Sequence, residues 1–301
     1  ELLILTTSPN RLTSINFDTK TPKVIELTKV PTCMAVAENG QEVIIGYTLA
    51  QLSLINLQEL KISKTLELPF APFDVALGEN GWCYVSSRDD IAGGNFASID
   101  MDSGRSVYNH VFYTVRGMTL LKKIPYRKQI MGIPANSFPS VPMVADISND
   151  SISADFKSYF FGEYDTNGEL WFLKNGAFGI AKNGRIYKYN FELPFEEQIV
   201  YYGNLGLLNE LNHASENRFI NKAALSFNIN SLQNEGCFVT LLELNELDKI
   251  GRVFPTPVVG FTLTIGYAFF DYSGENLLML INRKQNYVDN QSQWHIETRA
   301  L

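Results

Sequence analysis

The stretch that decides the fold reads APFDVALGENG at residues 71–81 and continues with WCYVSS at residues 82–87. Two apolar segments flank an Asn-Gly pair, which is the strongest short-range signal for a β-hairpin. The same pattern stands 41 residues earlier, where VPTCMAVAENG at 30–40 precedes QEVIIG at 41–46. A hairpin that recurs at this interval predicts a repeat protein, and about 40–45 residues is the length of one four-stranded propeller blade.

The chain length agrees with this repeat. The 301 residues hold about seven such repeats, so the sequence predicts an all-β, seven-bladed β-propeller of four-stranded antiparallel blades, with six or eight blades as alternatives. One interval does not fit, because 68 residues separate Gly168 from Gly236, too many for one blade and too few for two. We therefore expect a short helical or loop insertion near 204–222.

Both ends of the chain have the pattern of strands, at 1–28 and near 276–301. A radial arrangement of small sheets buries their apolar faces against one another and leaves short, protected edges. Closing such a ring usually requires strands from both chain ends in one blade. The sequence therefore predicts a single β-propeller domain over 1–301, with its ring closed by strands from both termini.

The two clearest blades resemble the YVTN-type β-propeller repeat, a WD40-like family found in bacterial surface-layer-like proteins. The matching residues of the opening strand and turn are Pro31, Val36 and Asn39-Gly40 in one blade, and Pro72, Val75 and Asn80-Gly81 in the next. The following strands match at Tyr84-Val85-Ser86-Ser87 and Ser98-Ile99-Asp100. The resemblance covers about the N-terminal third of the chain. It implies a propeller fold and a non-enzymatic surface or adhesion module.

Composition restricts the classes of partner. The net charge is −7, and the densest basic segment, at 122–128, has the pattern of a hairpin tip. Because an acidic chain repels phosphate backbones, we expect no nucleic-acid partner. No apolar run approaches the 18 residues that a membrane span needs, so direct membrane insertion is not expected. The chain begins within a strand and without Met, which favours a mature form or a fragment. We expect an extracellular, cell-surface or periplasmic location, with the cytoplasm as the alternative.

Chemistry-bearing motifs are few. The three cysteines form no CxxC motif, and the three histidines form neither HxH nor HExxH. No glycine-rich phosphate loop and no Gly-x-Ser-x-Gly element occur. The sequence therefore predicts no catalytic residue, no metal ligand and no cofactor.

Four residues are candidates for partner binding. Arg88, Asp89 and Asp90 lie between the second and third strands of the clearest blade, where neighbouring carboxylates repel each other unless solvated or bound to a cation or polar ligand. His213 lies in the expected insertion, and inserted loops on one propeller face often carry function.

Three functions remain open. The favoured one is a non-enzymatic binding or scaffolding propeller that recognises a protein or glycan partner through one face. Abundant aromatics would supply stacking platforms for such a partner. The alternative is a propeller enzyme of lactonase, lyase or hydrolase type, with a polar or metal site at the axial channel built from Asp89, Asp146 and Asp165. An intracellular assembly subunit is the third. These inferences rest on fold-level analogy.

Overall fold

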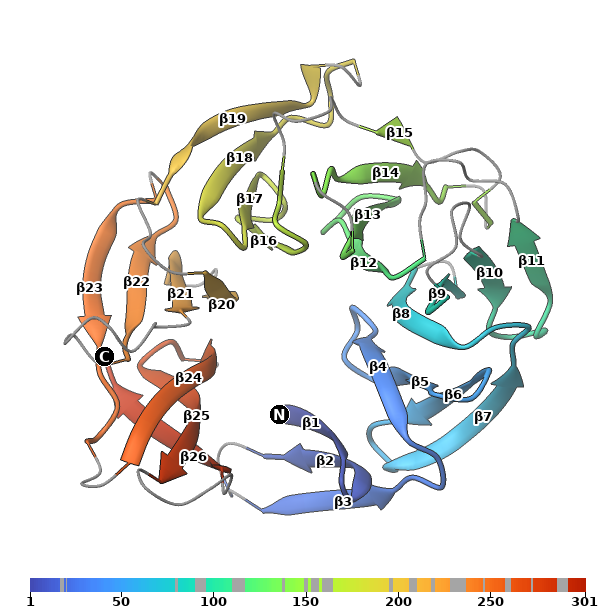
Figure 1. Ribbon diagram of the computed structural model, residues 1–301, viewed down its shortest axis with the longest axis horizontal. Helices are drawn as coiled ribbons and strands as arrows, with labels where there is room; N and C mark the ends of the chain where they lie inside the picture. The colour runs from blue at the N-terminus through green and yellow to red at the C-terminus, as the bar shows by residue number, and fades with distance from the viewer. Residues whose placement is uncertain are drawn as a thin grey trace. The chain divides into compact units, whose positions relative to one another are not determined.

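The computed structural model describes residues 1–16, 19, 21–78, 81–89, 96–109, 117–136, 139–148, 151–152, 157–158, 165–194, 197–205, 210–217, 220–227, 237–245, 247–257, 261–271, 273–285 and 292–301. The regular elements of these residues are β-strands, which form seven antiparallel sheets. The fold is a seven-bladed β-propeller, which confirms the predicted fold class (Figure 1). In the described part of the chain, no helix is long and apolar enough to cross a membrane.

The chain divides into two compact units, and the first contains residues 1–168. It holds four sheets, which we call blades 1 to 4. Their strands are β1 (Leu2–Thr7), β2 (Asn10–Ile15) and β3 (Pro22–Glu26); β4 (Pro31–Val36), β5 (Glu42–Tyr47), β6 (Gln51–Asn56) and β7 (Lys61–Glu67); β8 (Pro72–Leu77), β9 (Trp82–Ser87), β10 (Phe96–Asp100) and β11 (Ser106–Asn109); β12 (Thr119–Lys123), β13 (Gln129–Pro134), β14 (Met143–Asp146) and β15 (Lys157–Ser158). The first strands β1, β4, β8 and β12 contact one another in sequence, while the last strands diverge.

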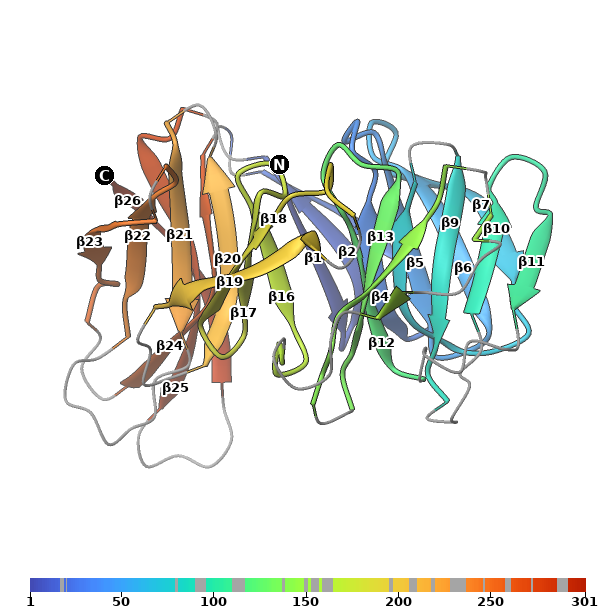
Figure 2. The ribbon, with the colours of Figure 1, turned by 90° about the horizontal axis from the view of Figure 1, so that it is seen from above.

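The second unit contains residues 169–301 and holds blades 5 to 7. Their strands are β16 (Leu170–Leu173), β17 (Phe178–Ala181), β18 (Arg185–Tyr189) and β19 (Ile199–Asn204); β20 (Leu211–Asn217), β21 (Lys222–Phe227), β22 (Val239–Glu243) and β23 (Lys249–Val253); β24 (Phe261–Phe270), β25 (Asn276–Gln285) and β26 (Ser292–Ala300). Within each unit the strands run side by side along a shared direction (Figure 2).

Glycines close the two hairpins that predicted the fold. Gly40 has φ +67° and Gly81 has φ +76°, the left-handed region that Gly adopts at no steric cost. A Cβ at either position would meet nothing within 4 Å, so the requirement is one of backbone conformation. Asn39 accepts a hydrogen bond from the Gln41 N–H (2.9 Å), whereas Asn80 lies outside the described residues. The turn chemistry therefore agrees with the prediction.

Each central strand packs against two neighbouring blades at once. In β5, Val43 and Ile45 pack with blade 1, while Ile44 between them packs with blade 3. In β9, Cys83 faces blade 2 and Tyr84 faces blade 4. Successive side chains of a strand point to opposite faces, so a strand buried on both faces is apolar throughout. This explains the continuous apolar runs, which lack the alternation of a half-exposed sheet.

Polar side chains join neighbouring blades at their first strands. Between blades 3 and 4, Asp74 Oδ2 accepts from the Leu121 N–H (2.8 Å), and Ser86 Oγ donates to the Thr119 carbonyl (2.6 Å). Between blades 6 and 7, three side chains of β20 donate to carbonyls of β24: Asn212 to Ile265 (3.0 Å), Ser215 to Ala268 (2.7 Å) and Asn217 to Asp271 (3.0 Å). These bonds satisfy backbone groups that the four-stranded ladders leave unpaired.

The predicted insertion near 204–222 is wrong for the residues described there. Leu211–Asn217 is β20, the first strand of blade 6. A β-bulge between Leu211 and His213 places Leu211 and Ala214 on the buried side three residues apart. A spacing of three imitates a helix, and the polar residues between them serve the contact with β24. Residues 206–209 lie outside the described part.

The two terminal sheets have three strands each among the described residues. Blade 1 consists of β1–β3 and blade 7 of β24–β26, and neither includes a strand from the other end of the chain. The other five sheets have four strands. Closure of the ring by a shared blade stays a prediction.

Candidate functional site

The predicted partner-binding residues fall in different units. Arg88 and Asp89 follow β9 in the first unit, and both are exposed. Their backbone N–H groups donate to the Ala71 carbonyl (2.9 Å) and to Ser87 Oγ (2.9 Å), which forms the turn after β9. Asp90 lies outside the described residues.

His213 lies in β20 of the second unit and is half-buried. Its ring centroid is 5.2 Å from that of Tyr267 in an edge-to-face contact and 4.7 Å from that of Phe269. Tyr267 and Phe269 are themselves nearly parallel, with an interplanar angle of 4°. His213 is therefore part of an aromatic cluster between the first strands of blades 6 and 7.

The three aspartates of the alternative enzyme site build local turns. Asp146 Oδ1 accepts from the Ser148 N–H (2.7 Å) and hydroxyl (2.5 Å), and Asp165 Oδ1 accepts from the Ser140 and Asn167 N–H groups (3.0 Å each). Among the residues that the structure describes, no group of three or more His, Cys, Asp and Glu side chains could hold a metal ion.

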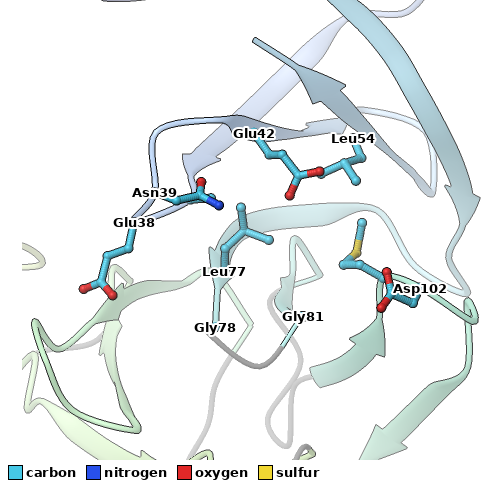
Figure 3. Close-up of a pocket in the computed structure, with 10 residues that line it drawn as sticks. Glu38, Asn39, Glu42, Leu54, Leu77, Gly78, Gly81 and Asp102 are labelled. Atoms are coloured by element: carbon cyan, nitrogen blue, oxygen red, sulfur yellow. The ribbon is translucent and has the colours of Figure 1, made fainter. Parts of the chain in front are cut away.

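A first pocket opens between the hairpins of blades 2 and 3, and we call it the acidic turn pocket (Figure 3). Its volume is about 310 Å³. The lining comes from four places: Ala37, Glu38, Asn39 and Glu42 of the β4–β5 hairpin, Leu54 of β6, Leu77, Gly78 and Gly81 of the β8–β9 hairpin, and Met101 and Asp102 of the turn after β10. The same Asn-Gly hairpins that predict the fold thus also form its walls.

The acidic turn pocket combines carboxylates with an apolar base. Glu42 and Asp102 lie on different sides of Leu77, whereas the Glu38 side chain turns away from them (Figure 3). Glu38 pairs with Lys123 of β12 (3.9 Å). Lys64 Nζ holds the Asp102 wall, donating to the carbonyls of Met101 (2.8 Å) and Asp102 (2.7 Å). Among the described residues, Glu42 and the Asp102 side chain form no ion pair, so two carboxylates remain available to a ligand.

A second pocket lies in the second unit, and we call it the aromatic pocket. Its volume is about 330 Å³, and its lining is Asn212, Thr264, Gly266, Tyr267, Asn282 and Trp294. Cross-strand pairing places Thr264, Asn282 and Trp294 in one row over β24, β25 and β26. Tyr267 is 45% exposed and Trp294 is 57% exposed, so both rings face the pocket with open surface.

Recurring bulges explain why this pocket exists in blade 7. Four first strands have a bulged residue: Thr32 in β4, Phe73 in β8, Asn212 in β20 and Gly266 in β24. Of these four, Gly266 alone has no side chain. A Cβ at Gly266 would lie 2.8 Å from Cη2 of Trp294, so the indole ring occupies the space above the bulge. Ser226 Oγ donates to the Gly266 carbonyl (3.1 Å) and Asn212 to that of Ile265 (3.0 Å), which holds the bulge in place.

Sequence reasoning identified one residue near this pocket and missed its lining. His213 contacts Tyr267, but it was selected for lying in an insertion that the described residues do not contain. Trp294 stands in the polar context QSQWHIETR, where a single exposed aromatic is the one available signal. Gly266 gives no signal, because its role depends on a ring 28 residues further along the chain.

The three thiols are free and buried, and burial raises their pKa values. The pKa of Cys33 is raised to about 12, first by desolvation and then by the Asp74 charge, and desolvation raises that of Cys237 to about 11. Desolvation also raises the pKa of Cys83 well above its ordinary value. Cys33 and Cys83 lie in strands, as predicted.

We expect none of the three thiols to react with a disulfide reagent in the folded protein at pH 8, because the reactive thiolate is suppressed and access is blocked. All three should react in denaturant. In the unfolded chain thiols ionise near pH ~8.5, so their contribution to folding stability is complete below that pH and is lost as the pH rises toward 12. Titration with the reagent, with and without urea, measures this. Rapid labelling of the folded protein would contradict it.

Solved structures resemble the chain over most of its length. The β-propeller domain of Cps50 (Swd1) from Myceliophteria thermophila matches 94% of this chain and 96% of its own, with a TM-score of 0.62 and 11% identity. U3-55K matches 93% of this chain and 87% of its own, with a TM-score of 0.60 and 14% identity. Both are WD40-type propellers, and at these identities the likeness establishes the fold alone. No family model and no curated protein matches the sequence.

Proposed function

We propose that this chain is a binding propeller that recognises a protein partner by accepting a lysine or arginine side chain in the acidic turn pocket. A propeller with WD40-type neighbours fits a scaffolding or binding role. The observation that carries the proposal is the pairing of Glu42 and Asp102 with an apolar base made by Leu54, Leu77 and Met101.

The pocket matches the two parts of a long cationic side chain. Lysine and arginine bury their methylene stems on apolar surface and keep the charged head beside polar groups. Leu77 would support the stem, and the carboxylates of Glu42 and Asp102 on its two sides would receive the head (Figure 3). Hydrogen bonds to charged partners are among the stronger ones in proteins. The chain's net charge of −7 would also attract a basic segment at long range.

Selection from a random peptide library tests the proposal. We expect selected peptides to be enriched in lysine or arginine and to bind less tightly as salt is raised. The double variant Glu42→Gln/Asp102→Asn should weaken binding about tenfold or more, or ~1.4 kcal/mol or more. The control Glu26→Gln/Glu59→Gln removes the same charge from exposed sites of the first unit and should bind as the parent does. Peptides without basic residues, or equal binding to both double variants, would refute the proposal.

Finer features of the assignment are predictions that accompany this proposal. They are the YVTN-type repeat, a location outside the cell, at its surface or in the periplasm, and the lack of a nucleic-acid partner. The acidic net charge supports the last of these.

A further inference from the structure

We infer that the aromatic pocket of blades 6 and 7 is a second binding site, which takes a neutral pyranose residue of a glycan. It goes beyond the protein-binding role proposed above, since it involves other residues in the other compact unit. The inference rests on three features of the pocket: exposed rings, an uncharged polar lining, and a space opened by a bulged glycine.

The rings supply a stacking surface. Trp294 and Tyr267 are about half exposed, although apolar rings of this size are usually buried. Both are held in place: His213 packs edge-to-face on Tyr267, and the Trp294 ring lies against the Gly266 backbone. A fixed ring loses little side-chain entropy on binding. One face of a pyranose carries C–H groups, which pack on the electron-rich face of an aromatic ring.

The polar lining selects a neutral ligand. Asn212, Thr264 and Asn282 supply the side-chain amides and the hydroxyl, and none of the six lining residues is charged in a chain with 57 charged side chains (25 basic and 32 acidic). Amides and hydroxyls both donate and accept hydrogen bonds, as sugar hydroxyls do. A peptide with charged side chains would find no counter-charge here, whereas a sugar ring would satisfy both the rings and the amides.

The bulge supplies the space. In blade 3 the equivalent bulged residue is Phe73, whose side chain would occupy this position, and in blade 7 it is Gly266. The volume of about 330 Å³ lies at the small end of ligand pockets, which fits one or two sugar rings better than an extended partner surface.

Tryptophan fluorescence of the full chain gives a direct test. Of the three tryptophans, Trp82 is 4% exposed and Trp171 is half-buried, so acrylamide quenching reports mainly on Trp294. The probes are neutral hexasaccharides of glucose, mannose, galactose and N-acetylglucosamine, each up to 10 mM. A hexagalacturonate and a leucine- and phenylalanine-rich peptide serve as acidic and apolar comparisons. We expect at least one neutral saccharide to protect Trp294 from the quencher, with the acidic sugar and the peptide inactive.

Variants identify the site, with saturation-transfer NMR as the readout where the indole is removed. Trp294→Ala and Asn282→Ala should each weaken binding about tenfold or more, and Trp294→Phe should retain part of it. Gly266→Ala places a methyl group against the indole and should displace the ring with little loss of stability, since the flexible end of a side chain gives way. Trp171→Phe is the matched control and should bind normally.

Two kinds of result would overturn the inference. One is the failure of every neutral saccharide to protect Trp294, or protection by the apolar peptide instead. The other is binding that persists unchanged in Gly266→Ala and Trp294→Ala. The Glu42→Gln/Asp102→Asn variant should bind saccharide normally, so the two proposals fail separately.

Discussion

Replacement of Tyr84 by alanine is expected to lower the free energy of unfolding by about 3–5 kcal/mol, the range for truncating a large buried aromatic side chain. Tyr84 is fully buried between blades 3 and 4. Its cross-strand neighbours are Ala76 on β8 and Ser98 on β10. Both are small, and the ladders hold their strands in register, so neither can fill the space that the ring leaves. The cavity should therefore persist and add its cost to the lost burial.

Urea unfolding followed by circular dichroism measures this effect. The control is Tyr126→Ala, because Tyr126 lies in the β12–β13 turn and is 65% exposed. Surface substitutions of this kind usually change stability by less than ~0.5 kcal/mol. A loss below ~2 kcal/mol for Tyr84→Ala would mean that blades 3 and 4 do not pack as described.

Leu225→Ala is expected to cost about 2–5 kcal/mol in the second unit. Leu225 is fully buried at the centre of β21, in the cluster that joins blades 5 and 6. Its cross-strand neighbours are Ala214 and Thr240, so the surroundings are again too small to collapse into the void. The control is Leu193→Ala, since Leu193 is exposed in the same unit. Equal losses for Leu225→Ala and Leu193→Ala would contradict the assigned packing.

The two variants together address the domain organisation. If the chain is one domain with a closed ring, as its terminal strands predict, Tyr84→Ala and Leu225→Ala should each lower the midpoint of one shared transition. Separate transitions, each moved by the variant in its own unit, would show that units 1–168 and 169–301 unfold independently.

Local chemistry explains why the fold was predictable. Asn39-Gly40 places a glycine where the backbone needs positive φ, and the runs around it are apolar because both strand faces are buried. Such signals repeat at a fixed interval, so even a single sequence shows seven blades. The same reasoning failed at Leu211–Asn217, where a bulge altered the strand period and hydrogen bonds to another blade replaced apolar contacts.

The sites were much less predictable. Arg88 and Asp89 were candidates because they are adjacent in sequence, and the structure places them in a turn after β9. The acidic turn pocket joins residues from four segments between 37 and 102, each of which reads as an ordinary hairpin or strand by itself.

By itself, the sequence determined the hairpins, their repeat interval and the all-β propeller, because turn conformation and strand burial are properties of short segments. Only the tertiary structure decided where ligands find room. Gly266 and Trp294 face each other across three strands, and Glu42 and Asp102 meet over Leu77, because blades pack at distances that no local pattern encodes. Binding surface arises between segments, so it depends on the packing of side chains that are far apart in the chain.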